Sequence, residues 1–395
     1  MLLSLALIIL VGFALKGVFE KLHMPGLLGM LLAGILLGPY VLNLISPEII
    51  AVSSDLREIA MIVILVRVGI TLDLHDLKRV GRPAILMSFI PATFEIVAVV
   101  FLAPLLLGIS CLEAAVLGAI LGAVSPAIIV PKMLHLMEAG YGKKNSVPQM
   151  ILAGASADDI YVIVLFTSFM GLATGHDFSP VQLISIPLSM IAGLGAGIAI
   201  GFVLVQIFQR VHMRDTIKVL LILGLAILVI GLETSISNWV PFSGFLAVMA
   251  IGGTIQKAYG KLAKRITGKF AKIWVAAELI LFVMLGSVVD IRHVRGVGIA
   301  ALLLILAALV FRSIGVLVSL IRTQLSHKER IFCIIAGIPK ATVQAAIGAM
   351  PLAAGLTAGN TILTVSVLAI LLSAPLGAVG IELGYKKLLE RKQPL

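Results

Sequence analysis

The sequence is poor in charged residues. Of its 395 residues only 12% are Asp, Glu, Lys or Arg, whereas 60% are hydrophobic. Soluble domains carry about 25% charged residues, so this chain has too little polar surface to fold in water at its length. Apolar runs of about 20 residues recur along the chain, and each is long enough to cross a hydrocarbon core as a helix. We therefore predict an all-α integral membrane protein in contact with membrane lipid.

Cysteine and acidic residues are also scarce. The two cysteines, Cys111 and Cys333, are expected near opposite membrane faces, which argues against a disulfide and against redox chemistry. Bases outnumber acids by 30 to 19, but they lie in short loops between apolar runs. That pattern is typical of orientation signals and not of a nucleic-acid-binding surface. No cluster of thiols or imidazoles favours a transition metal, and we expect no cofactor and no enzymatic activity.

Thirteen transmembrane segments are predicted from the hydrophobic runs. They begin near Leu2, Gly26, Arg57, Ala84, Leu112, Val147, Pro180, Thr216, Pro241, Phe270, Gly296, Lys328 and Gly359. Alternate loops collect Lys and Arg, and the opposite set holds acids such as Glu48 and Asp55. The positive-inside rule then places the tail, residues 385–395, in the cytoplasm and the N-terminus outside a cell (inner) membrane. Arg292 and Arg295 disagree with this orientation.

The third and tenth segments end alike, which indicates an internal repeat. Gly69 and Asp73 have the spacing of Gly286 and Asp290, and the shift is 286 − 69 = 217 residues. Seven segments separate the two copies, so the second copy is inverted. We predict a first six-helix repeat over 1–173, a linking helix over 180–210 and an inverted repeat over 216–384, an arrangement typical of secondary transporters. The same shift relates Glu95 to Arg312, each in the fourth segment of its half.

Five charged residues lie well inside hydrophobic segments: Glu95, Asp158, Asp159, Arg312 and Lys340. A charge at this depth is costly and needs a partner or a function. Three acids and two bases leave one unmatched negative charge. Such a site accepts either one proton or one small cation, and competition for that place is the chemistry of exchange.

The paired aspartates cannot both face one partner, because adjacent helical residues point about 100° apart. One can be held by a base while the other faces a cavity. Ser156 shares the face of Asp159, so its hydroxyl can join the shell of a bound cation. Oxygen ligands suit a hard ion such as sodium or lithium, bound transiently at Asp159. Which base pairs with which acid stays open, although Lys340 is the nearest candidate to hold Asp158.

Prolines interrupt the fifth and twelfth segments, within Ser125–Pro131 and Gly337–Gln344. Proline inside a helix removes a backbone hydrogen bond, and the freed groups are tolerated at membrane depth only inside protein or along a cavity. Interrupted helices at equivalent positions of two repeats indicate a transport site. We predict that the two broken helices cross, and that their cavity is lined by Val124, Ser125, Pro126, Pro339, Thr342 and Gln344.

Three motifs resemble the monovalent cation:proton antiporter superfamily, and its NHA-type sodium/proton exchanger branch in particular. Leu121–Ala127 with Val130-Pro131 is similar to the family's broken fifth helix. Ser156–Ile160 is similar to its paired-aspartate helix, and Ile338–Ala346 to its long Pro-Lys-Ala-Thr-Val-Gln-Ala signature. The intervening lengths also fit, so the resemblance covers nearly the whole chain.

The resemblance implies a homodimer in which a core domain moves against a dimerising scaffold, giving alternating access and a role in pH homeostasis. It implies that Asp159 is the main ion and proton carrier and Asp158 its partnered neighbour. Glu95 and Arg312 match the acid and base of this branch's fourth helices. Ala157 departs from the animal members, which tend to carry a bulky aromatic there, so the shape of the cavity stays open.

Other functions fit the sequence less well than sodium/proton exchange. A potassium/proton antiporter of the same fold is the main alternative. An intramembrane aspartyl protease needs its aspartates on two helices with a Gly-x-Gly-Asp motif, and a channel needs a repeated carbonyl filter, neither of which this sequence has. The stoichiometry depends on Lys340. If it releases its proton when the cation binds, transport is electrogenic, and the adjacent aspartates favour this through the resemblance to related antiporters. If it stays charged, exchange is one for one, which the single unmatched negative charge favours. On balance we expect electrogenic transport.

Overall fold

The computed structural model describes residues 1–71, 81–174, 180–236 and 242–391, apart from the side chains of Ser156, residues 180–187 and 234–236, and Arg295. Within these residues the secondary structure is helical except for one isolated β-bridge between Tyr141 and Arg391. The chain forms two compact units. One comprises Met1–Ser54, Leu74–Ala173 and Phe282–Leu395, and the other Asp55–Asp73 and Thr174–Leu281. They are called here the large unit and the small unit.

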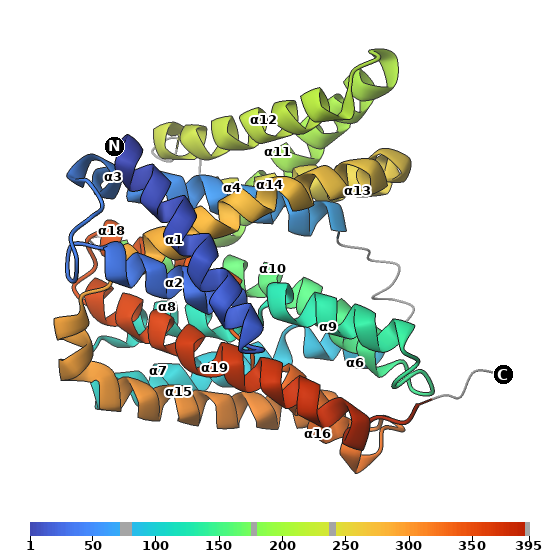
Figure 1. Cartoon of the computed structure of the whole chain (residues 1–395). Helices are drawn as coiled ribbons and strands as arrows, with labels where there is room; N and C mark the ends of the chain where they lie inside the picture. Colours follow the sequence, from blue (N-terminus) through green and yellow to red (C-terminus); the bar gives the residue numbers. More distant parts are fainter. Residues whose placement is uncertain (72–80, 175–179, 237–241, 392–395) are drawn as a thin grey trace. The chain divides into compact units, whose positions relative to one another are not determined.

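The large unit contains α1 (Leu2–Lys21), α2 (Gly26–Leu37), α3 (Pro47–Ala51), α6 (Arg82–Met87), α7 (Ile90–Leu107), α8 (Cys111–Gly122), α9 (Pro126–Glu138), α10 (Val147–Thr174), α15 (Ile291–Ser319), α16 (His327–Ala336), α17 (Thr342–Ile347), α18 (Met350–Ala353) and α19 (Gly359–Leu388). Helices α7 and α15 pack along each other, and α7 also packs on α8 (Figure 1). Helix α19 lies against both α15 and α16. These contacts place the breaks after α8 and α16 inside the unit.

The small unit contains most of α4 (Ser53–Thr71) and of α14 (Gly260–Ser287), together with α11 (Pro180–Arg210), α12 (Asp215–Ile236) and α13 (Gly244–Ala258). Glycines on α11 let it approach α13 closely. A Cβ at Gly193 would meet the Ser243 carbonyl oxygen, and one at Gly197 would meet that of Ala247. Small residues at helix–helix contacts are typical of membrane bundles, where close backbone packing replaces the hydrophobic drive of water.

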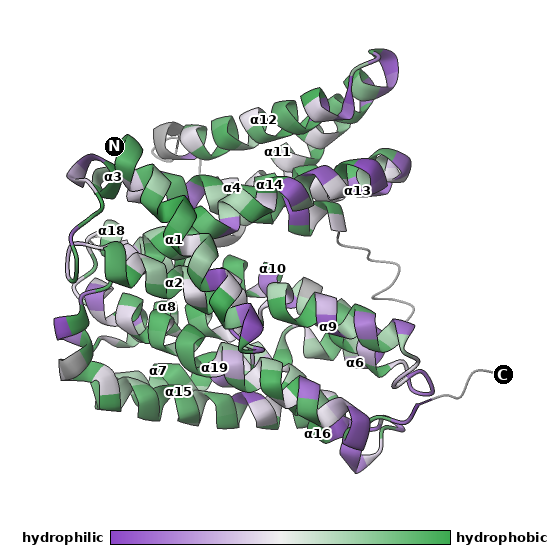
Figure 2. Ribbon diagram, viewed as in Figure 1, coloured by the Kyte–Doolittle hydropathy of each residue, from purple (hydrophilic) through white to green (hydrophobic). Residues whose placement is uncertain are grey.

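Nine helical stretches in the described residues are long and apolar enough to cross a membrane. Hydrophobic residues run along most of each helix, and hydrophilic ones gather toward helix ends such as those of α13 and α16 (Figure 2). Gly26–Leu37 and Thr342–Ala353 are shorter apolar helices. The all-α membrane fold is thus confirmed, whereas the number of thirteen crossings stays a prediction.

Two predicted segments differ from the helices observed. The segment expected from Phe270 begins at Gly260, because Lys261, Lys264 and Arg265 lie on an exposed face whose opposite side is buried. Charged residues therefore continue the helix although they end the apolar run. The segment expected from Ala84 is divided into α6 and α7. Pro91 has no N–H to offer the carbonyl four residues earlier, so the helix is interrupted there.

The packing around the repeated glycines follows the predicted shift. In the large unit, a Cβ at Gly286 would meet the Leu31 carbonyl oxygen. In the small unit, a Cβ at Gly69 would meet the Met249 carbonyl oxygen. The glycines are 217 apart and their partners 249 − 31 = 218 apart. Asp73 lies outside the described residues, and the division into two six-helix repeats and a linking helix stays a prediction, which this equivalence supports.

Candidate ion-binding site

The two interrupted helices meet at their breaks. Helix α8 ends at Gly122 and α9 begins at Pro126, while α16 ends at Ala336 and α17 begins at Thr342. The Ser125 N–H donates to the Pro339 carbonyl oxygen at 2.8 Å. Proline at the first position of α9 lacks only an N–H that the helix start leaves unpaired in any case. The α16–α17 break therefore supplies an acceptor for a backbone N–H that the α8–α9 break leaves unpaired.

The side chain of Gln344 links the breaks further. Its Nε2 donates to the carbonyl oxygens of Ile120 at 2.9 Å and Ala123 at 3.0 Å. The hydroxyls of Ser125 and Thr342 lie 3.5 Å apart, and these residues are also 217 positions apart. Both are fully buried. The Gln344 amide and the two hydroxyls therefore fix how the α8–α9 break crosses the α16–α17 break.

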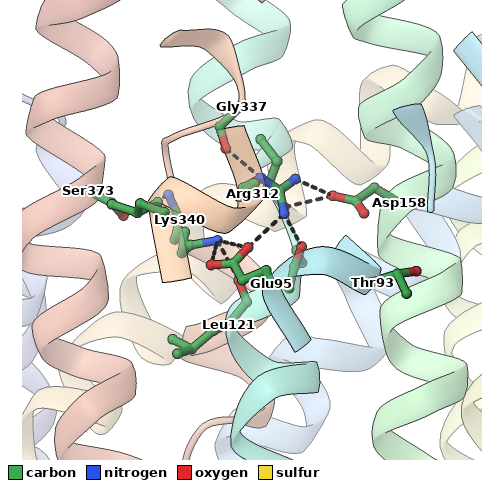
Figure 3. Close-up of polar contacts among 12 residues, drawn as sticks. Thr93, Glu95, Leu121, Asp158, Arg312, Gly337, Lys340 and Ser373 are labelled. Carbon is green, nitrogen blue, oxygen red and sulfur yellow. Dashed lines mark hydrogen bonds and ion pairs between the residues drawn. The ribbon is translucent and has the colours of Figure 1, made fainter. Parts of the chain in front are cut away.

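Four buried charges form one network beside this crossing (Figure 3). Arg312 on α15 donates from Nη1 to Glu95 Oε2 at 2.9 Å and from Nη2 to Asp158 Oδ2 at 3.1 Å. Lys340 Nζ lies 2.8 Å from Glu95. All four side chains are at most 4% exposed. Two acids and two bases cancel, as a buried network of this kind requires.

Backbone carbonyls at the ends of the broken helices hold the two bases. Arg312 donates from Nε to the Gly337 carbonyl oxygen at 2.7 Å, and its Nη1 also donates to that of Gly122. Lys340 Nζ donates to the carbonyl oxygen of Leu121. These carbonyls have no intrahelical partner and carry the negative end of the helix dipole, so they suit cationic donors. The bases thereby tie α8 and α16 to α7 and α10.

Asp158 and its neighbour Asp159 have different surroundings, as adjacent positions on a helix should. Asp158 Oδ2 also accepts the Val124 N–H at 3.0 Å. Asp159 is only 1% exposed. Its Oδ1 has no hydrogen-bond partner, and no base among the described residues forms an ion pair with it. The network therefore leaves one buried carboxylate, Asp159, without a compensating charge.

The predicted site residues come together. Glu95, Arg312, Lys340, Asp158, Val124, Ser125, Pro339, Thr342 and Gln344 all take part in the contacts above, and Pro126 begins α9. The pairing that the sequence leaves open is Arg312 with Asp158, and the ammonium of Lys340, the nearest candidate for Asp158, reaches Glu95 instead. The Ser156 side chain lies outside the described part of the structure.

Sequence reasoning missed the backbone acceptors and Ser373. The carbonyls of Leu121, Gly122 and Gly337 carry no side-chain signal. Ser373 Oγ on α19 accepts the Lys340 N–H at 3.1 Å. A signal for this residue existed, because 373 − 217 = 156 makes Ser373 the repeat equivalent of Ser156.

An all-α membrane fold with two interrupted helices meeting at buried charges defines a secondary transporter. A model of the family described as "Sodium/hydrogen exchanger, transmembrane" matches residues 5–383, and the chain belongs to this family. It is therefore a multi-pass membrane transporter whose family exchanges sodium for protons. The antiporter resemblance read from the three motifs is confirmed.

Individual relatives agree with this assignment. Human sodium/hydrogen exchanger 9B2 is 33% identical over 385 residues, covering 93% of this chain and 70% of the relative. Human sodium/hydrogen exchanger 9B1 is 29% identical over 385 residues, which cover 93% of this chain and 73% of that relative. The sodium proton antiporter MjNhaP1 from Methanocaldococcus jannaschii superposes with a TM-score of 0.82 over 97% of both chains at 22% identity, which shows a common fold.

Proposed function

We propose that this protein exchanges sodium or lithium for protons by alternating access, and that Asp159 carries the cation and the proton in turn. One observation carries the proposal: Asp159 is buried and forms no ion pair with any described residue, beside four charges that cancel. A buried ionised carboxylate without a partner is strongly destabilised. Binding a proton or a small cation removes that cost, and the two occupants exclude each other. Mutual exclusion at one carboxylate couples the two fluxes.

Asp158 is less suited to this carrier role. Its Oδ2 is held by Arg312 and by the Val124 N–H, so a proton would have to displace an ion pair. Its Oδ1, together with Gln344 Oε1, has no hydrogen-bond partner among the described residues. These oxygens border the α8–α9 break, because the Val124 N–H donates to Asp158 and Gln344 donates to the Ala123 carbonyl oxygen. Such oxygens are ligands that a hard monovalent cation prefers.

The pairing of Lys340 bears on stoichiometry. Its ammonium is bonded to Glu95 and to the Leu121 carbonyl, not to either aspartate. A cation that binds at Asp159 therefore displaces no partner of Lys340, and the lysine keeps its proton. We accordingly favour exchange of one proton per cation, without net charge movement. A homodimer with a core moving against a scaffold completes the proposal on the strength of the family resemblance, and a cytoplasmic C-terminus follows from the basic residues of alternate loops.

The test is proton flux in proteoliposomes that hold a preset pH gradient, with sodium, lithium or potassium added in turn. Sodium and lithium should dissipate the gradient and potassium should not. Asp159→Asn is nearly isosteric and should fold with wild-type thermal stability yet give no flux. Asp158→Asn should instead lower stability, because Arg312 loses one of its two acids. Wild-type flux in Asp159→Asn would disprove the assignment, and flux with potassium alone would favour the potassium/proton alternative.

A further inference from the structure

Two glutamates far from the site make matching contacts at the starts of the broken helices. Ser110 is the N-cap of α8, and its hydroxyl accepts the Glu113 N–H at 3.2 Å. Glu113 Oε2 in return accepts the Ser110 N–H at 3.1 Å. Ser326 and Glu329 form the same capping box at the start of α16. The boxes are 329 − 113 = 216 residues apart, one less than the predicted repeat shift.

Each of these glutamates also reaches the span that follows the other broken helix. Glu113 Oε1 accepts the N–H of Ala358, the N-cap residue of α19, at 2.8 Å. Glu329 accepts both hydrogen bonds from Asn145 Nδ2, two residues before α10, at 3.0 and 2.9 Å. A capping box needs only the contacts within its own helix. The contacts with α19 and with the start of α10 are additional and reciprocal.

We infer that Glu113 and Glu329 are positioning residues that set where the carbonyl ends of the two broken helices stand relative to the transport site. The Glu113–Ala358 contact is one clamp, and the Glu329–Asn145 contact is the other. Charge-assisted hydrogen bonds of this kind are stronger and more directional than neutral ones. Glu113 is nine residues from Gly122, about 14 Å along a helix that rises about 1.5 Å per residue.

The route from clamp to site runs through the half-helices themselves. Helix α8 ends in the Leu121 and Gly122 carbonyls, which hold Lys340 and Arg312, and α16 leads to the Gly337 carbonyl, which holds Arg312. An axial slip of either half-helix would move these acceptors. Helix α19 runs between the two clamps, from the end near α18 to the end near α16 (Figure 1). It also carries Ser373, which receives the Lys340 N–H.

The first test rests on the proposed function and measures cation-dependent exchange in proteoliposomes. Glu113→Gln and Glu329→Gln should each raise the KM for sodium about fivefold, which corresponds to about 1 kcal/mol. A merely structural defect would instead lower the maximal rate through the amount of folded protein. Ser110→Ala is the matched control, since it removes a cap from α8 but leaves the Glu113–Ala358 bond. It should lower thermal stability and leave KM unchanged.

A compensating pair sharpens this test. In Glu329→Gln with Asn145→Asp, the amide and the carboxylate exchange places. The Gln side chain at position 329 keeps one oxygen that accepts the Ser326 N–H, and its NH2 group can donate to the new carboxylate at position 145. KM should return toward the wild-type value. An unchanged KM in both single glutamate variants, or an equal rise in Ser110→Ala, would overturn the inference.

A second measurement does not depend on transport. Hydrogen exchange of the full chain in nanodiscs reports the amides of Val124, Ser125 and Lys340, whose partners are Asp158, Pro339 and Ser373. Both glutamate variants should accelerate exchange at these amides, whereas Ser110→Ala should affect only the first turn of α8. Wild-type protection at all three in the glutamate variants would refute the clamps. Absence of sodium or lithium flux in the wild type, with protection lost as expected, would refute the proposed function and leave the clamps standing.

Discussion

Removing Glu95 or Arg312 tests the charge network directly. Glu95→Gln leaves Lys340 without its acid partner, and removing one member of a buried ion pair costs about 3–5 kcal/mol of unfolding free energy. Arg312→Gln should cost more. It leaves Asp158 with only the Val124 N–H, and it also removes the donor from two carbonyls, Gly122 and Gly337. Each carbonyl left unsatisfied adds about 1–3 kcal/mol.

The double variant should cost less than the sum of the two single variants. With Glu95→Gln and Arg312→Gln together, Lys340 and Asp158 remain as one charge of each sign. Residues that share a network couple by about 0.5–3 kcal/mol, and we expect the upper half of that range. Exchanging the two residues, Glu95→Arg with Arg312→Glu, should restore nothing. It would place a carboxylate against Asp158 and two carbonyl oxygens.

The measurement is reversible unfolding in mixed detergent micelles, without sodium or lithium, because a bound cation would stabilise the folded state by itself. Lys132 and Glu382 provide the matched control. They also lie 2.9 Å apart, but their side chains are 26% and 59% exposed. An exposed pair contributes about 0–1 kcal/mol, so Glu382→Gln should be nearly neutral. Additivity of the two network variants within about 0.5 kcal/mol would refute the shared network.

Three further predictions follow from other contacts. Solid-supported-membrane electrophysiology should detect no sustained current on sodium jumps, since Lys340 keeps its proton; a current that Lys340→Gln abolishes would contradict this. Gly197→Ala should lower thermal stability, because its Cβ would meet the backbone of α13, whereas Gly195→Ala has open space and should be tolerated; equal melting temperatures would refute the close packing. Gln344→Glu replaces the Nε2 donor with an oxygen that faces the Ile120 and Ala123 carbonyl oxygens, so it should destabilise the protein more than Gln344→Leu, which removes both bonds without adding a buried charge; a lower melting temperature for Gln344→Leu than for Gln344→Glu would refute this.

The sequence by itself determined the membrane class, the helical segments and the breaks. These follow from local properties: the length of apolar runs, the missing N–H of Pro126 and Pro339, and the cost of a charge in hydrocarbon. The 217-residue shift also relates Glu95 to Arg312, but it leaves open which base pairs with which acid. Local reasoning was wrong where polarity and structure diverge, as in the basic first turns of α14, which are helical because their opposite face is buried.

Only the tertiary structure decided how the buried charges are shared. Asp158 and Asp159 are identical in type and adjacent in sequence, and which of them meets Arg312 depends on the rotation of α10 against α15. Lys340 meets Glu95 because the crossing of the two breaks sets the direction of its side chain. The acceptors from Leu121, Gly122 and Gly337 are backbone groups that every residue possesses. Which carbonyls accept from Arg312 and Lys340 depends on where α8 and α16 end in space. The amino-acid types at those positions do not determine this.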